Sequence, residues 1–289
     1  MGRYRISTKN GIDSNTTLQV EVTTACNLNC TICLRRGLER PNKFLSLGDF
    51  KGMLDPGSFR YVGLHGWGEP LLHQELFEMV EYAESRGVHT NLTTNGTLVE
   101  KRLDEIFRSR LREIAFGIYD KKLLSEVSPQ VEGLVAQREK GHFKRPKIYF
   151  DITIYQGNRD QIPEMIKLAS EMRIDAIILH RLFNVYGVDS DAKCLSEEEE
   201  KKLFKEIKGI TRSLKIELYL PERHSYPCRI VRRSIFVTVD GKVTPCTYLL
   251  EDHLGDAFEE GVERVLRSEV YGSFVKKMKQ HPICSRCRW

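Results

Sequence analysis

Apolar runs alternate with segments of helical periodicity along the first two thirds of the chain. Six short apolar runs predict strands at residues 18–22, 61–65, 88–92, 114–118, 148–154 and 176–179. Between them, apolar residues recur at helical spacing over 72–83, which Gly87 ends, and over 162–172, and Ser46 is placed to cap the first helix. Six β–α units in a row predict an α/β fold with a parallel sheet, either doubly wound or curled into a barrel.

The pattern changes after residue 182. Residues 184–191 predict a loop, 196–214 a charged helix, 215–221 a strand and 261–278 an amphipathic helix. Apolar and polar residues alternate over 235–246 on both sides of Asp240-Gly241, a turn pair typical of hairpins, and so predict a β-hairpin there. We expect an N-terminal tail at 1–17, a first domain at 18–187, a linker at 188–222 and a small cysteine-rich domain at 223–289.

Unusual residues follow the predicted strands. The stretch VEVTTACNLNCTICLRR places Cys26, Cys30 and Cys33 after the first strand, HGWGEPLLH follows the second and LTTNGTL the third. Asp120 and Asn158 come at the ends of the fourth and fifth. Because ligands bind at the carboxyl ends of parallel strands, these segments predict one functional edge.

Composition limits the function classes. The 289 residues are 40% hydrophobic and 29% charged, and the net charge of +5 does not demand nucleic acid as a partner. No stretch approaches the ~20 apolar residues that span a bilayer, and the polar N-terminus lacks a signal core, so we expect a cytoplasmic protein without membrane contact. We interpret the basic pairs Arg232-Arg233 and Lys276-Lys277 as solvated faces.

Thiols are reduced in the cytoplasm, so the eight cysteines suggest metal ligation before disulfides. Cys26, Cys30 and Cys33 form C-x3-C-x2-C. A structural zinc site takes four protein ligands, and a [4Fe–4S] cluster takes one per iron. Three thiolates would leave one iron of such a cluster uncovered. Cys194 stands alone, and we interpret it as a spare thiol.

The three-cysteine motif, the Gly-Glu-Pro turn and the Thr-Asn-Gly segment together resemble the radical S-adenosylmethionine (SAM) superfamily. The resemblance implies a partial (β/α)6 barrel of TIM type, with Cys26, Cys30 and Cys33 as ligands of a [4Fe–4S] cluster. It also implies that the uncovered iron binds SAM, and that an external one-electron reductant of the ferredoxin or flavodoxin type drives SAM cleavage to a 5′-deoxyadenosyl radical.

The same resemblance implies SAM contacts. The position of Ile32 packs near the adenine, although many relatives have an aromatic residue there. Asn95 and, more weakly, Asp120 and Asn158 are candidates for polar contacts to SAM. The methionine amino group is received by a turn that matches Gly66, Trp67, Gly68 and Glu69, in which Trp67 replaces a glycine of the commoner Gly-Gly-Glu form.

Some of these residues also have a structural interpretation. Glu69 is placed to cap the helix after Pro70, and Asn95-Gly96 is a favoured turn pair. His65 and His73 flank the Gly-Glu-Pro turn, but single histidines near strand ends are more often packed or hydrogen-bonded than in contact with substrate.

The closing cysteines form a second group of four ligands with the pattern C-x12-G-x4-C followed by C-x2-C: Cys228, Cys246, Cys284 and Cys287. Spacing alone allows zinc or an Fe–S cluster. In a radical SAM context the group resembles the SPASM or twitch extension, which holds auxiliary [4Fe–4S] clusters. No further cysteine follows, which implies one auxiliary cluster and a role as electron acceptor for the substrate radical.

We therefore predict a radical SAM oxidoreductase or maturase. No leader-binding domain is expected before the first strand, which favours a small molecule, a cofactor or a folded partner protein as substrate. The size and layout resemble the group that modifies the cofactor of tungsten-containing aldehyde ferredoxin oxidoreductases. The alternatives are a peptide or protein maturase and, in another class, a zinc-stabilised binding protein held by the closing cysteines.

Overall fold

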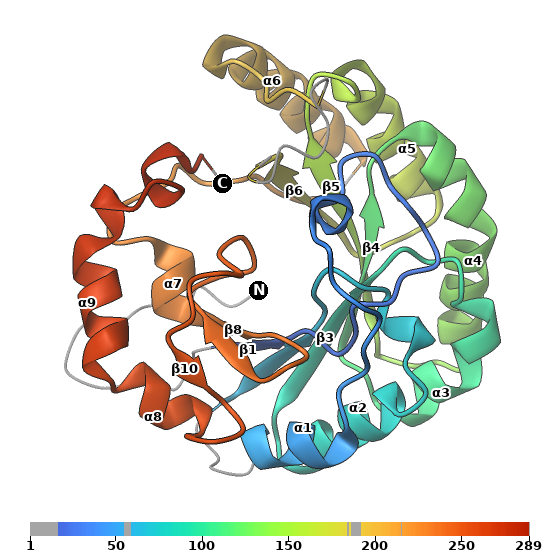
Figure 1. Ribbon diagram of the computed structural model, residues 1–289. Coiled ribbons are helices and arrows are strands. Elements are labelled where there is room, and N and C mark those ends of the chain that lie inside the picture. Colours follow the sequence, from blue (N-terminus) through green and yellow to red (C-terminus); the bar gives the residue numbers. More distant parts are fainter. Residues whose placement is uncertain (1–16, 55–58, 184, 186–191, 215, 289) are drawn as a thin grey trace. The chain divides into compact units, whose positions relative to one another are not determined.

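The computed structural model describes residues 17–54, 59–183, 185, 192–214 and 216–288, which form two compact units (Figure 1). Unit 1 comprises Met1–Ala25, Arg40–Asn91 and His224–Cys287, and unit 2 comprises Cys26–Glu39, Leu92–Arg223 and Arg288–Trp289. The predicted loop at 184–191, apart from Val185, and the predicted tail, apart from Thr17, lie outside the described residues.

Unit 1 contains a mixed sheet in the order β10-β9-β8-β1-β2-β3. β1, β2 and β3 are parallel, β8 runs parallel to β1, and β9 and β10 continue antiparallel. The strands are β1 (Thr17–Val20), β2 (Tyr61–Leu64), β3 (His89–Thr94, of which Leu92 onward belongs to unit 2), β8 (Ser234–Val237), β9 (Lys242–Thr244) and β10 (Gly255–Asp256). Its helices are α1 (Leu47–Leu54), η2 (Pro70–Leu72), α2 (Leu76–Ser85), α7 (Arg229–Arg233), α8 (Val262–Leu266), α9 (Glu269–Lys277), η5 (Met278–Gln280) and η6 (Cys284–Arg286).

Unit 2 continues from the end of β3 and contains four parallel strands in the order β4-β5-β6-β7. They are β4 (Glu113–Ile118), β5 (Lys147–Ile154), β6 (Ala176–Arg181) and β7 (Glu217–Tyr219). Helices α4 and α5 cover one face of these strands (Figure 1). The helices are η1 (Leu34–Gly37), η3 (Glu100–Arg102), α3 (Leu103–Arg108), α4 (Lys121–Lys140), η4 (Arg159–Gln161), α5 (Ile162–Glu171) and α6 (Glu197–Leu214).

The predicted elements are confirmed at nearly every position. All six predicted strands are present, as are the charged helix α6 and the short strand β7. The amide of Asp49 donates to Ser46 Oγ at 3.0 Å, which is the predicted cap of α1. Gly87 and Gly241 have φ of 76° and 80°, in the region that glycine enters without strain, at the end of α2 and in the β8–β9 hairpin.

One helix prediction is wrong. The single helix expected at 261–278 is two helices, α8 and α9. The break falls at Ser268, whose backbone is extended and whose hydroxyl accepts a hydrogen bond from the amide of Tyr271 at 3.2 Å. A serine that caps a new helix competes with continuation of the preceding helix. The apolar periodicity continues across Ser268 and therefore gave no sign of the break.

The predicted domain boundaries stay a prediction. The residues from His224 onward belong to unit 1, where β8 pairs residue by residue with β1. None of the described helices is both long and apolar enough to cross a membrane.

A buried carboxylate joins three segments of unit 1. Glu21, just after β1, is fully buried, and both its oxygens accept hydrogen bonds from Arg40, at 2.9 and 2.7 Å. The amide of Val239, after β8, donates to Oε2 of Glu21 at 3.2 Å. A Cβ added at Gly66 would lie 2.6 Å from Cγ of Glu21, so the turn after β2 packs directly on this side chain.

We expect Glu21→Ala to lower the free energy of unfolding by about 3–5 kcal/mol, because it leaves the Val239 amide without its acceptor and Arg40 with only the more distant, exposed Asp240 at 3.9 Å. The matched control is Lys122→Ala, which removes an exposed ion pair with Glu126 on α4 at 4.0 Å. That change should cost less than about 0.5 kcal/mol. Chemical denaturation measures both, and equal effects of the two substitutions would contradict the role of Glu21.

Candidate active site and metal centres

The first three cysteines lie in one loop of unit 2. The chain runs from Cys26 through Cys30 to Cys33, where the 3₁₀ helix η1 begins, and the amide of Cys33 donates to the carbonyl of Cys30 at 3.1 Å. The amide of Leu28 lies 3.5 Å from Cys26 Sγ, and the side-chain amide of Asn95 lies 3.9 Å from the same sulfur. N–H donors directed at a cysteine sulfur are one of the features that tune Fe–S clusters.

The electrostatics of this loop show that its thiols are close neighbours. Burial raises the pKa of Cys30 to about 11, and the charges of Cys33 and Cys26 contribute in the same direction. Burial also raises the pKa of Cys33, whereas the Arg35 backbone and the Arg35 and Arg36 charges act against this rise. Thiolates crowded in this way are stable only when a cation neutralises them, so the donor set fits a cationic Fe–S cluster.

Two predicted SAM contacts lie beside this loop and also hold local structure. The Nδ2 of Asn95 donates to Asn27 Oδ1 at 2.9 Å, while its Oδ1 accepts from the amide of Thr97 at 3.0 Å, as expected for a turn. The carboxylate of Asp120 caps α4 through the amide of Leu123 at 2.8 Å, and its charge also acts on Cys30. Asn95 therefore contacts the cysteine loop directly, and the charge of Asp120 acts on the thiol of Cys30.

Ile32 lies on an apolar surface of unit 2 with aromatic neighbours. It is buried and packs with Leu182 and Ala192, and Tyr119 and Tyr155 lie against this cluster. The aromatic side chain that many relatives carry at this position is absent, but tyrosines after β4 and β5 supply rings beside it.

The turn after β2, in unit 1, is fastened to the residues that precede the cysteine loop. The amide of Glu69 donates to the carbonyl of Ala25 at 2.8 Å. A Cβ added at Gly68 would lie 2.2 Å from the carbonyl oxygen of Thr23, so only glycine fits there. The Glu69 carboxylate is buried and caps η2 through the amide of Leu71 at 3.0 Å, which is the structural role expected for it from its place before Pro70.

Trp67 connects this turn to the segment that contains Cys246. Its indole N–H donates to the carbonyl of Thr247 at 2.9 Å, and its ring meets that of Tyr248 edge-on at a centroid distance of 5.8 Å. Trp67, which replaces the commoner glycine, thus links the turn to Thr247 within unit 1. No sequence pattern had indicated this contact.

The four closing cysteines also gather, all in unit 1. Cys284 is buried in a cluster with Val231, Leu249 and Met278, and Cys228 and Cys246 pack against it. Burial raises the pKa of Cys246, and the charges of Cys284, Cys287 and Cys228 add to this rise. Burial, with Cys287 and Cys228, also raises the pKa of Cys284 to about 12. These four thiols therefore fit one further cationic centre.

The thiols of each group are neighbours without converging on a point. Among the described residues, no three Cys, His, Asp or Glu side chains are arranged to hold a single metal ion. A [4Fe–4S] cluster takes one thiolate at each iron, so its ligands surround a volume and need not meet at one atom.

Four residues considered at the sequence level have structural partners. His73 is buried, with Nε2 2.7 Å from the carbonyl of Leu45, and His65 Nδ1 lies 3.2 Å from Gln19 Nε2. Asn158 is buried, and its Nδ2 donates to backbone carbonyls after β4 and within β5 at 2.8 and 2.7 Å. The thiol of the exposed Cys194 donates to the carbonyl of Leu182 at 3.1 Å. Each of these four side chains therefore contacts another part of the protein.

Comparison with known proteins gives two family matches. Residues 20–119 match the radical SAM superfamily, and residues 228–288 match the SPASM iron–sulfur cluster-binding domain. The chain therefore contains a radical SAM region followed by a SPASM region. It is therefore an enzyme whose radical SAM domain binds a [4Fe–4S] cluster and SAM and whose SPASM domain binds auxiliary iron–sulfur clusters.

The radical SAM relatives differ in what they act on. The chain is 22% identical to the tungsten-containing aldehyde ferredoxin oxidoreductase cofactor-modifying protein of Pyrococcus furiosus, over 93% of this chain and 86% of the relative. It is 24% identical to a probable GTP 3′,8-cyclase of Methanococcus vannielii, over 92% and 95%. Streptococcus suis SuiB, solved with S-adenosylmethionine and also with its precursor peptide SuiA, matches with a TM-score of 0.76 at 16% identity, over 94% and 70%. This likeness confirms the predicted α/β class and radical SAM fold.

A polar pair on two parallel strands of unit 2 was missed at the sequence level. His180 Nε2 on β6 lies 3.2 Å from Asp151 Oδ1 on β5, and the two side chains are 29% and 23% exposed. They lie on the face of β5 and β6 opposite to the buried Phe150, Ile152 and Leu179, and Gly117 on β4 pairs with Asp151 in the register. The alternation of β5, with polar residues at 151 and 153 between apolar ones, was the available signal.

The tie between Trp67 and Thr247 gives a first prediction. Trp67→Phe keeps an aromatic ring beside Tyr248 but removes the N–H donor. We expect it to lower the free energy of unfolding by about 1 kcal/mol. We also expect faster alkylation of Cys246 in metal-free protein, because the neighbouring backbone loses its anchor. Mass spectrometry measures the rate, with Cys194 as the internal control. An unchanged rate at Cys246 would show that the hydrogen bond does not restrain this loop.

The Asp151–His180 pair gives a prediction about pH. Burial disfavours the charged imidazole, but Asp151 outweighs it, so the pKa of His180 lies above the ordinary 6.5. The folded state then holds this proton more tightly than the unfolded chain. The stabilisation from this ion pair is complete below about pH 6.5, and it is lost as the pH rises through the pKa of His180 in the folded state.

We expect Asp151→Asn to cost more stability below pH 6.5 than well above it, as measured by denaturation across this range. In a His180→Gln background the same substitution should show no such dependence. A cost that is independent of pH in both backgrounds would mean that the pair is not an ion pair.

Proposed function

We propose that the chain uses two [4Fe–4S] clusters, one on each cysteine group, to perform radical chemistry on a small molecule or cofactor. Cys26, Cys30 and Cys33 would hold the SAM-binding cluster, and the closing four cysteines one auxiliary cluster. The observation that carries this proposal is the division of the thiols into a group of three and a group of four, in each of which burial and then the neighbouring cysteines raise a thiol pKa.

When bound, the cluster and SAM supply a 5′-deoxyadenosyl radical that removes a hydrogen atom from the substrate. The chain's own residues would bind and orient these groups. Ile32, with Tyr119 and Tyr155 beside its cluster, offers an apolar surface to the adenine. Asn95 offers an amide next to Cys26. Gly66 and Gly68 allow the backbone of the turn to lie close to its neighbours, as a methionine amino group bound by carbonyls requires.

Glu69 has a different role in this proposal from the one implied by the family pattern. Its carboxylate caps η2 and is buried, so it fixes the direction of the turn. We infer that Glu69 orients the carbonyls of the turn, which then accept hydrogen bonds from the methionine ammonium. Asp120 similarly combines a helix cap with a negative charge near the cysteine loop.

The auxiliary group is proposed to accept the electron that a substrate radical must lose. Cys284 is buried among Val231, Leu249 and Met278 and the other three cysteines are partly buried, which suits an electron carrier more than a site that exchanges ligands. A one-electron reductant of the ferredoxin or flavodoxin type would supply the electron for SAM cleavage. Modification of a tungsten or pterin cofactor is supported by the similarity to the Pyrococcus furiosus protein.

A peptide or protein substrate is the second candidate, and the fold shared with SuiB, which was solved with a precursor peptide, favours it. The two candidates differ in what stimulates SAM cleavage. Release of 5′-deoxyadenosine above the background should increase with a pterin cofactor under the first proposal and with a peptide under the second. Stimulation by neither would leave only the uncoupled reaction and would contradict both.

Iron content tests the assignment of the two clusters. Anaerobically reconstituted wild type should contain about eight irons, and a triple Cys26/Cys30/Cys33→Ala variant about four. Electron paramagnetic resonance of the wild type should change on addition of SAM, because SAM binds the uncovered iron, and that of the triple variant should not.

Cys194→Ala is the matched control, since it removes an exposed thiol from outside both groups, and it should retain all the iron. A wild type with about four irons, all lost in the triple variant, would contradict the auxiliary cluster and restore zinc as the occupant of the closing cysteines.

A further inference from the structure

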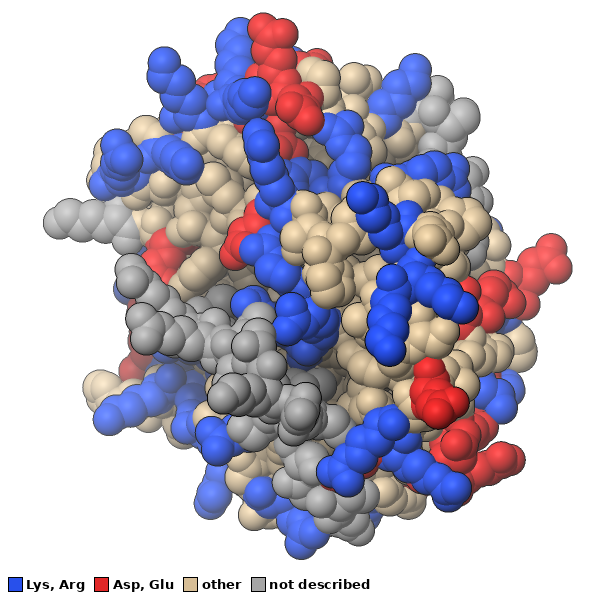
Figure 2. All heavy atoms as spheres, turned by 90° about the vertical axis from the view of Figure 1, so that its left-hand side faces the viewer, with Lys and Arg blue, Asp and Glu red and all other residues tan. Residues whose placement is uncertain are grey.

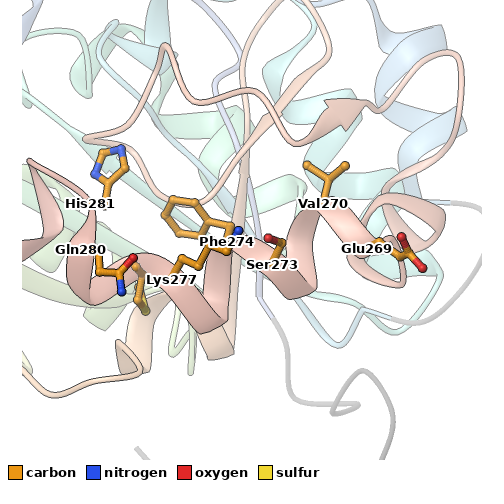
Figure 3. Close-up of a pocket in the computed structure, with 8 residues that line it drawn as sticks. Glu269, Val270, Ser273, Phe274, Lys277, Gln280 and His281 are labelled. Carbon is orange, nitrogen blue, oxygen red and sulfur yellow. The ribbon is translucent and has the colours of Figure 1, made fainter.

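An apolar groove runs along α9 of unit 1. It has a volume of about 600 Å³ and lies along one side of α9 and the turn that follows (Figure 3). Val270 and Phe274 contribute its apolar surface together with Met278, and Val270 is 54% exposed. Glu269, Ser273, Lys277, Gln280 and His281 complete the lining. Exposed apolar surface with a polar rim is typical of an interaction site.

The groove's own charged lining is one lysine, Lys277, and one glutamate, Glu269, but further exposed basic residues lie on the same segment of the chain. Residues 268–287 contain four Lys or Arg and one acidic residue, Glu269. The four are exposed: Lys276, Lys277, Lys279 and Arg286. Figure 2 looks onto the side of the molecule where α8 and α9 lie in Figure 1, and Lys and Arg dominate its charged surface. Asp252, whose Oδ1 lies 3.0 Å from Nε2 of His281, is a second acidic group beside the groove. A partner that fits this surface is acidic.

The groove is separated from the closing cysteines by one layer of side chains. Phe274 and Met278 line it and also pack in the cluster that contains Cys284, with Cys228 and Cys246 against it. His281 lines it as well, and its Nδ1 lies 3.4 Å from the amide of Cys284. A protein seated on the groove would therefore come close to the thiols.

We propose that the α9 groove is the docking site of an acidic one-electron carrier protein. The proposal rests on the auxiliary-cluster role given above and adds the place and the chemistry of the partner. The apolar side chains supply contact next to the cysteine cluster, and Lys277 with the exposed Lys276 and Lys279 beside it steers the acidic carrier. The pair Lys276-Lys277 is then part of an interface, in contrast to the solvated face expected from the sequence.

The test measures binding of two probes, an acidic [4Fe–4S] ferredoxin and an acidic flavodoxin, to the anaerobically reconstituted protein by titration calorimetry at low and high salt. We expect at least one probe to bind, more weakly at high salt. Charge reversal of Lys276 and Lys277 to Glu should weaken it by about tenfold or more. Val270→Ser should weaken it by about threefold, because apolar contact is lost.

The matched control is charge reversal of Lys201 and Lys202, an adjacent, exposed lysine pair on helix α6. This variant should change the affinity by less than about twofold, since it alters net charge equally but on residues that do not line the groove. Equal weakening by both reversals, or no binding of either probe at low salt, would overturn the proposal.

Two parallel measurements distinguish carrier docking from self-association of the chain and from a failure of the radical chemistry. Sedimentation of the protein alone detects self-association, and a dimer that Val270→Ser dissociates would make a second copy the occupant and overturn the proposal. Cleavage of SAM by wild type with dithionite tests the proposed function without any carrier. If cleavage occurs but binding ignores Lys276 and Lys277, docking fails alone; if no cleavage occurs, the proposed function fails.

Discussion

The buried Glu21 carboxylate is the constraint on which the rest of unit 1 depends. A carboxylate without exposure is tolerated only when its charge and lone pairs are matched, and Arg40 and the Val239 amide match them. These partners come from the segment that leaves the cysteine loop and from the C-terminal hairpin. One side chain thereby fixes where the first strand ends, where the chain re-enters unit 1 after residue 39, and where the C-terminal part attaches.

The same constraint explains the choice of residues in the turn after β2. Gly66 has no side chain because Glu21 occupies the space, and Gly68 has none because the carbonyl of Thr23 does. Trp67, between them, points its indole to Thr247 in the segment next to Cys246. The turn is thus held on one side by the N-terminal strand and on the other by the cysteine-rich segment, both within unit 1.

The strands and the cysteine groups could be predicted because local patterns determine them. Apolar runs of four to eight residues located all six strands, and Asp240-Gly241 located the hairpin. Contacts between distant residues have no such signal. The Asp151–His180 pair depends on the register of β5 with β6, and the partner of Trp67 is 180 residues away along the chain. The break at Ser268 was missed because the apolar period continues across it while the cap depends on backbone geometry.

The burial of the thiols has a consequence for the newly made chain before it receives iron. Only a thiolate is a good nucleophile, and the raised pKa values of Cys30, Cys33, Cys246 and Cys284 keep these groups protonated near neutral pH. Protonated thiols are slow to oxidise or to form mixed disulfides. The fold therefore protects these four cysteines during the interval between synthesis and maturation, and an iron donor that also accepts protons would release that protection.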